Sequence, residues 1–182
     1  MEPAGAPLPP LMTRVGLALV SPRRAFELSD DAGGRAGLTD VATLLLFKFL
    51  AVEARAIVIA AWTMIGVGFL PGLGALGPRL QATLGFDLIV VFGGGALVTL
   101  AAGKKRRPSR DFDLAAVAWI PYLVLTLLAQ LVLSVANLAA GVVATRWMSQ
   151  TITMIGLALV AGWLSMAIRH ARQRREDVAH AG

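Results

Sequence analysis

The chain has 182 residues, of which 57% are hydrophobic and only 15% are charged, and its mean hydropathy is +0.71. This apolar share exceeds that of an ordinary soluble domain, so the composition predicts an all-α integral membrane protein of one domain. The absence of cysteine excludes disulfides, thiolate metal sites and cysteine catalysis, and the net charge of +6 lies beside apolar runs, which favours anionic lipid headgroups over nucleic acid as a partner.

The amino-terminal segment, residues 1–37, is predicted to be cytoplasmic. Its first ten residues are rich in Pro and Ala and lack the basic region of a cleavable signal peptide. Residues 11–28 contain an apolar stretch that is too short to span a bilayer, together with three arginines and Pro22. This pattern predicts an interfacial helix with a break near Pro22, and a helix folded against the protein's own cytoplasmic face is an equally open alternative.

The first predicted span lies within residues 41–70 and ends at a turn predicted at residues 71–74. Thirty helical residues extend for about 45 Å, whereas the hydrocarbon core of a bilayer is about 30 Å thick. One part of this segment must therefore protrude from the membrane, and residues 54–70 alone are long enough to span.

Three charged side chains interrupt this segment, namely Lys48, Glu53 and Arg55. If residues 54–70 form the span, the three charges lie at the inner interface. If they are buried, they need partners from another span or a second subunit, because Glu53 points away from Lys48 and Arg55 on a helix. Both interpretations remain open from the sequence.

The second predicted span covers residues 85–103 and carries Asp87 near its outer end. Three consecutive glycines at positions 93–95 lie in its middle. We expect them to allow a neighbouring helix to approach closely, and the alternative is a hinge or an unwound ligand site.

The third predicted span, residues 114–144, is a single long helix that Pro121 is expected to kink. The carboxylates of Asp111 and Asp113 suit its amino terminus. Polar or small residues recur along it at helical spacing, which predicts either interhelical hydrogen bonds or a polar pathway. This stripe consists of Thr126, Gln130, Ser134, Asn137 and Gly141.

The fourth predicted span, residues 151–168, has a small-residue face that we expect to pack against this stripe. The face consists of Ala158, Gly162 and Ser165. Residues 170–182 are predicted to form a basic cytoplasmic tail in which His170 and His180 are solvated.

The distribution of basic residues predicts the topology. Arginines and lysines are abundant before the first span, in the loop at 104–110 and after the fourth span, whereas Arg79 and Arg146 are alone in the other two loops. The positive-inside rule therefore predicts four spans within residues 38–169, with both termini in the cytoplasm. The preference for Arg, Ala, Gly and Leu indicates a bacterial coding style, hence the inner membrane. The predicted lipid-headgroup contacts are Arg23, Arg24, Lys104, Lys105, Arg106, Arg107 and Arg110.

No constellation of catalytic or metal-binding residues is evident, so we expect a protein without enzymatic activity, cofactor or metal. The polar and charged residues inside the spans are the candidate functional site, because such residues are costly in a bilayer. They are Lys48, Glu53, Arg55, Asp87, Gln130 and Asn137.

Two segments resemble bacterial members of the Yip family, the Ypt/Rab-interacting multi-span membrane proteins. One is Leu11 to Leu28, above all the run Ser21-Pro22-Arg23-Arg24-Ala25-Phe26, and the other is Ala116 to Leu125 with Pro121 inside an apolar helix. The resemblance implies a non-enzymatic membrane protein with a cytoplasmic amino-terminal segment. Yip-family proteins usually have five spans, one more than this sequence predicts.

Two functions are consistent with these features. The first is a membrane adaptor or complex subunit that contacts anionic lipid and protein partners. The second is a small transporter or ion-coupled permease that uses the charged and polar residues of the spans. In either case we expect a homo-oligomer or a subunit of a larger membrane complex.

Overall fold

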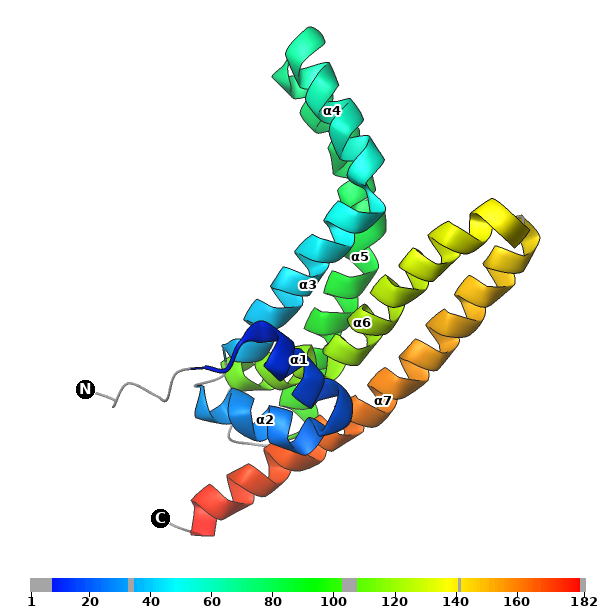
Figure 1. Ribbon diagram of the computed structural model, residues 1–182. Helices are drawn as coiled ribbons and strands as arrows, with labels where there is room; N and C mark the ends of the chain where they lie inside the picture. Colours follow the sequence, from blue (N-terminus) through cyan, green and yellow to red (C-terminus); the bar gives the residue numbers. More distant parts are fainter. Residues whose placement is uncertain (1–7, 33–34, 103–107, 141, 181–182) are drawn as a thin grey trace.

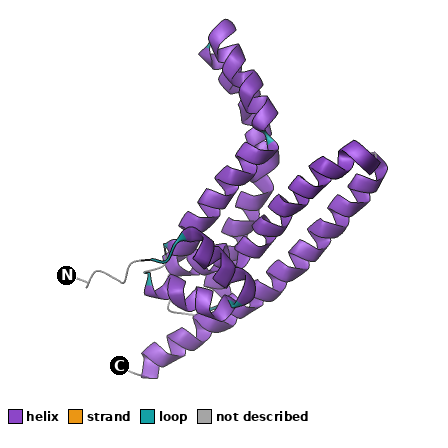
Figure 2. Ribbon diagram, in the orientation of Figure 1, coloured by secondary structure: helices purple, strands orange, loops and turns teal. Residues whose placement is uncertain are grey.

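The protein is all-α throughout the residues that the computed structural model describes, which are 8–32, 35–102, 108–140 and 142–180 (Figure 2). These residues form seven helices, so the predicted all-α class is confirmed. The helices are α1 (Leu11–Val20), α2 (Pro22–Asp31), α3 (Ala36–Val52), α4 (Ala54–Gly66), α5 (Phe69–Ala101), α6 (Pro108–Ala140) and α7 (Val142–His180).

The predicted break in the amino-terminal segment is confirmed, since α1 ends before Ser21 and α2 begins at Pro22. Proline suits the first position of a helix, where its missing N–H has no intrahelical partner to lose. Both helices pack against α6, and α2 also contacts α7 (Figure 1). Their inward side chains, Val15, Ala18, Ala25 and Phe26, are buried in the hydrophobic core. The segment is therefore folded against the protein itself.

The first predicted span is divided between α3 and α4, which are separated at Glu53. They have 17 and 13 residues, so α4 is too short to cross a bilayer alone and α3 is at the lower limit of the spanning length. Among the described residues, three helices are long and apolar enough to span, namely Phe69–Ala101, Pro108–Leu133 and Gln150–Asp177. The structure thus has three candidate spans where the sequence predicts four.

The predicted turn at residues 71–74 is wrong, because these residues belong to α5. The chain reverses instead at Gly68, whose φ of 133° is accessible mainly to glycine. Pro71 lies in the first turn of α5. Backbone N–H groups there have no acceptor within the helix, so proline is tolerated. Gly72 is buried against α4, and a Cβ atom on it would lie 2.7 Å from the Ala60 carbonyl oxygen. The second predicted span therefore begins well before residue 85.

The glycines at positions 93–95 allow α5 to pack closely on α6, as predicted. A Cβ atom on Gly95 would lie 2.4 Å from Cδ1 of Phe112, and one on Gly94 would lie 3.6 Å from Cβ of Ala115. A Cβ atom on Gly93 would meet nothing within 4 Å. Only part of the triplet is thus needed for this packing.

The face of α7 that packs on α6 differs from the predicted one. Gly156, Val160 and Ala167 are buried, and a Cβ atom on Gly156 would lie 2.6 Å from Cδ2 of Tyr122. Ala158 and Ser165 of the predicted face are exposed. Because the Tyr122 ring leaves no room for a side chain opposite it, the face of α7 that carries Gly156 packs on α6.

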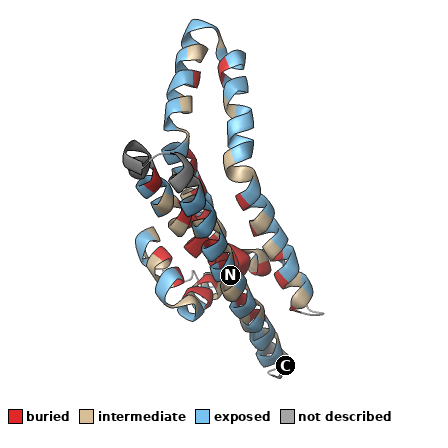
Figure 3. Ribbon diagram, turned by 90° about the vertical axis from the view of Figure 1, so that its right-hand side faces the viewer, coloured by how far each residue is buried: buried red, intermediate tan, exposed pale blue. Residues whose placement is uncertain are grey.

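A two-helix arm diverges from the α6–α7 pair at the upper end of the molecule (Figures 1 and 3). We call this arm, α4 together with residues 69–80 of α5, the apolar hairpin. Its outward side chains are large, hydrophobic and exposed, as expected for a surface in contact with lipid. They include Val58, Ile59, Trp62, Ile65, Phe69 and Leu70.

Candidate functional site

Lys48 of α3 and Asp87 of α5 form an ion pair between two helices, with Lys48 Nζ 2.5 Å from Asp87 Oδ2. The Asp87 side chain has no exposed surface, and that of Lys48 is 12% exposed. An isolated charge in such surroundings is costly, and a partner from another helix offsets that cost. The predicted candidates Lys48 and Asp87 are therefore brought together.

Two aromatic residues of α6 complete the surroundings of Asp87. The rings of Trp119 and Tyr122 are stacked with centroids 4.3 Å apart, and both side chains are buried. Trp119 lies beside Asp87 and interacts with it. Within the described structure, however, neither Asp87 Oδ1 nor Trp119 Nε1 has a partner at hydrogen-bonding geometry. The carboxylate is thus satisfied through only one of its two oxygens.

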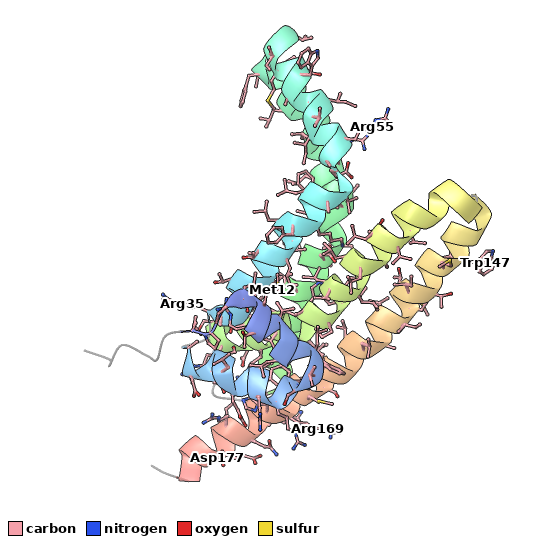
Figure 4. The ribbon with its side chains drawn as sticks, viewed as in Figure 1. Met12, Arg35, Arg55, Trp147, Arg169 and Asp177 are labelled. Carbon is pink, nitrogen blue, oxygen red and sulfur yellow. The ribbon has the colours of Figure 1, made fainter. Side chains whose placement is uncertain are left out.

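Glu53 takes part in a second polar cluster, at the break between α3 and α4. Its carboxylate accepts hydrogen bonds from Arg79 Nη1 at 3.1 Å and from the Thr83 hydroxyl at 2.9 Å, both on α5. Helix α5 therefore supplies a partner for each of two charges on the preceding segment. Arg55 is exposed near the opposite end of the molecule from Arg35 and Arg169 (Figure 4). The predicted site is accordingly two separate clusters.

Gln130 of α6 lies at a small pocket of about 90 Å³ between α3 and α6, which is open to the outside because most of its lining residues are exposed. This volume exceeds the roughly 10–15 Å³ that one water molecule requires. Ala51, Val52, Leu127 and Leu131 form the rest of its lining. On α3, the first two lie one helical turn beyond Lys48 on the same face, but neither Lys48 nor Asp87 lines this pocket.

The other residues of the predicted α6 stripe show no interhelical hydrogen bond within the described side chains. The Thr126 hydroxyl donates to the carbonyl oxygens of Tyr122 and Leu123 in its own helix, so the predicted interhelical role is wrong for this residue. The side chains of Ser134 and Asn137, and Gly141 itself, lie outside the part of the chain that is described.

A third set of polar contacts fastens α1 and α2 to one end of the bundle. We call this end the polar end and define it by Arg14, Asp30, Asp40, Asp111, Asp113 and His170. Buried Asp113 of α6 accepts hydrogen bonds from the Ser29 hydroxyl of α2 and, at 2.8 Å, from the Leu38 N–H of α3. Because Leu38 is in the first turn of α3, Asp113 caps that helix from outside.

Arg14 of α1 pairs with buried Asp40 of α3, its Nε lying 2.8 Å from Oδ2. This hydrogen bond raises the pKa of the Arg14 guanidinium above its ordinary value, so Arg14 is a permanent cation. Sequence analysis missed this pair because 26 residues separate its members and no local pattern signals such a contact.

The last part of α7 binds the polar end through several side chains. Arg175 Nη2 lies 2.7 and 2.8 Å from the two carboxylate oxygens of Asp111, and Arg172 Nε donates to the carbonyl oxygen of Ala101 at the end of α5. A cation suits the carboxyl-terminal end of a helix. Residues beyond 169 therefore continue as a helix docked on the bundle.

His170 lies 3.0 Å from Asp30 Oδ2, and its ring centroid is 5.8 Å from that of Phe26. The prediction of a solvated tail histidine is thus wrong for His170, because the amino-terminal helices cover it. The side chain of His180 lies outside the described ones.

The predicted lipid-contacting residues divide into three groups. Arg23 and Arg24 are exposed on α2, Arg110 is half-buried, and residues 104–107 lie outside the described ranges. Arg35, Arg169, Arg172 and Arg174 add exposed basic side chains at the polar end, where Figure 4 places Arg35 and Arg169. Four carboxylates of that end, Asp30, Asp40, Asp111 and Asp113, are instead occupied by internal partners.

Comparison with known proteins gave no match to a family model, a curated protein or a solved structure. The resemblance to the Yip family therefore stays a prediction. Within the described residues, no three His, Asp or Glu side chains are grouped so that they could hold a metal ion.

Proposed function

We propose that the protein is a non-enzymatic multi-span membrane adaptor whose polar end contacts anionic lipid headgroups and a protein partner. The observation that carries this proposal is the division of charges at the polar end. Its buried carboxylates are paired internally, while arginines of α2 and α7 remain exposed. Exposed acidic residues, Glu27, Asp31, Glu176 and Asp177, are fewer than the exposed arginines, and the basic loop at 104–107 adds four more cations.

The proposed arrangement has four passes through a bacterial inner membrane. In it, α3 and α4 together make the first pass, and the break at Glu53 lies within that pass or at its outer edge. Contacts from α1 to α7, from α2 to α6 and from the end of α5 to α7 support a common side for both termini and the 104–107 loop. The basic residues of these segments favour the cytoplasmic side.

Lipid binding is the property that tests this proposal. In the paired substitution Arg23→Gln with Arg24→Gln, two exposed cations are removed without loss of a described contact. At about 1 kcal/mol for each basic residue near an anionic surface, binding of phosphatidylglycerol should weaken roughly 30-fold. Native mass spectrometry of the full chain with phosphatidylglycerol and phosphatidylcholine measures this affinity.

The matched control is Arg55→Gln, because Arg55 is also exposed but lies at the opposite end. Binding of the anionic lipid should be nearly unchanged in this variant. An equal loss of affinity in both variants, or equal affinity of the wild type for the two lipids, would contradict the proposal that the polar end binds anionic lipid.

A small transporter is the second candidate, and the buried Lys48–Asp87 pair favours it. The test measures flux in proteoliposomes that contain an Asp87→Asn variant. Asp87 is chosen because it is the fully buried member of the ion pair, whereas Glu53 belongs to a separate cluster. Flux that the variant abolishes supports transport, and the absence of any ion or solute movement in the wild type excludes it.

A further inference from the structure

We propose that Asp87 is a proton-binding site inside the helical bundle. Its Oδ2 is occupied by the Lys48 ammonium group, but its Oδ1 has no hydrogen-bond partner among the described residues, although the side chain is fully buried. A buried ionised oxygen without a partner is strongly destabilised, and a proton on that oxygen removes the charge. The proposal does not depend on lipid binding at the polar end.

The neighbours of Asp87 make this site distinct from the other buried carboxylates. Asp113 has two donors, the Ser29 hydroxyl and the Leu38 N–H, each bound to a different oxygen. Asp111 is held through both oxygens by Arg175. Among the described residues, the charged and titratable groups that interact with Asp87 are Lys48 of α3 and Tyr122 of α6. Asp87 Oδ1 thus lacks a hydrogen bond of good geometry, although the Trp119 indole lies beside the carboxylate, whereas both oxygens of Asp111 and of Asp113 are bonded.

The route for the proton starts at the Lys48 side of the pair. The Lys48 side chain is partly exposed, whereas that of Asp87 is not. Water in contact with the exposed part of the Lys48 side chain is the nearest source of a proton for the pair.

The proton balance is simple. At low pH, one proton from water binds Asp87 Oδ1 and gives a neutral carboxyl group, while Lys48 keeps its ammonium protons. At high pH the carboxyl releases that proton to water and the ion pair forms again. Protonation therefore removes the ion pair that joins α3 to α5.

A hydrophobic carbodiimide tests this proposal, because it reacts with protonated carboxyl groups in apolar surroundings and adds to them as an N-acylurea. The full-length chain in lipid nanodiscs is treated with dicyclohexylcarbodiimide, and the modified residue is identified by mass spectrometry. Modification of Asp87 should rise roughly tenfold for each unit of pH lowered, as long as most Asp87 is ionised. Asp113, equally buried but with both oxygens bonded, serves as the internal control and should stay unmodified.

The wild-type titration needs no variant, so a folding defect in Asp87→Asn does not remove the test. A second measurement, infrared difference spectroscopy between about pH 9 and about pH 5, should show the carbonyl band of a buried protonated carboxyl, and Asp87→Asn should lack it. Modification of Asp87 that does not change with pH, or equal modification of Asp113, overturns the proposal. Because neither measurement requires flux, its failure is distinguishable from failure of the transporter candidate.

Discussion

Gly95 is the residue at which α5 approaches α6 most closely within the glycine triplet. In Gly95→Ala, the added methyl group would lie within 3 Å of three atoms of the Phe112 ring, which must then move. We expect the free energy of unfolding to fall by about 1–3 kcal/mol, as overpacked cores generally show. Gly93→Ala is the control, because open space surrounds that position and alanine favours a helix. Thermal unfolding in detergent compares them, and equal effects in the two variants would contradict the packing described.

Arg175 and Arg174 are neighbours on α7 with different surroundings. Arg175 holds buried Asp111 at 2.7 Å, whereas Arg174 is 51% exposed and lies 3.6 Å from Asp30. Arg175→Gln leaves a buried carboxylate without its counter-charge and should lower the free energy of unfolding by roughly 3–5 kcal/mol. Arg174→Gln should cost at most about 1 kcal/mol. Denaturant titration of the two variants checks this difference, and a larger loss for Arg174→Gln would refute it.

The sequence identifies the charged residues inside apolar segments but not the side chains with which they pair. Lys48, Glu53 and Asp87 are recognisable because charges are rare in apolar segments. Their partners are not, since 39 residues separate Lys48 from Asp87 and 26 separate Glu53 from Arg79. In the structure α5 supplies a counter-charge for Lys48 and for Glu53, whereas Arg55 is exposed.

Helices α1 and α2 are held on the helical bundle by a few side chains. Phe26 is fully buried against the bundle, and the Trp163 indole N–H donates to the Ala18 carbonyl oxygen at 2.9 Å. Phe26→Ala removes a large apolar contact, typically about 3–5 kcal/mol in a protein core. Amides of α1 and α2 should then exchange with solvent at least tenfold faster, while those of α6 remain unchanged.

Hydrogen exchange measured by mass spectrometry gives both values in one experiment. Met12→Ala provides the control, because Met12 lies on the same pair of helices and is 79% exposed. Uniformly faster exchange in every helix of the Phe26→Ala variant would show that α1 and α2 are an integral part of the folding unit rather than a docked element.

Element boundaries show where sequence reasoning succeeds and where it cannot. The break at Pro22 and the long helix through Pro121 follow from local chemistry and are found in the structure. The turn at residues 71–74 was predicted from its Pro and Gly content, yet Pro71 is tolerated in the first turn and Gly72 is needed for contact with α4. A glycine can occur in a turn or at a close contact between helices, and the position of the neighbouring helix determines which of the two applies.

The whole molecule has one end rich in ion pairs and another that is almost wholly apolar. Periodicity and length predict the membrane-spanning character, and three candidate spans support it. The packing of the amino-terminal helices and of the last turns of α7 depends on contacts between distant segments, so it is not visible in local patterns. The basic surface predicted at one end is therefore only partly inferred from sequence, because internal carboxylate partners determine which arginines remain exposed.

The membrane topology can be tested directly, because the chain contains no cysteine. Single cysteines are introduced at four exposed positions and labelled with a membrane-impermeant maleimide, in intact cells and in inverted membrane vesicles. Ser109→Cys and Asp177→Cys should react only in inverted vesicles, and Gly74→Cys and Trp147→Cys only in intact cells. Reaction of all four from the same side, or of Ser109→Cys and Trp147→Cys from the same side, would contradict it.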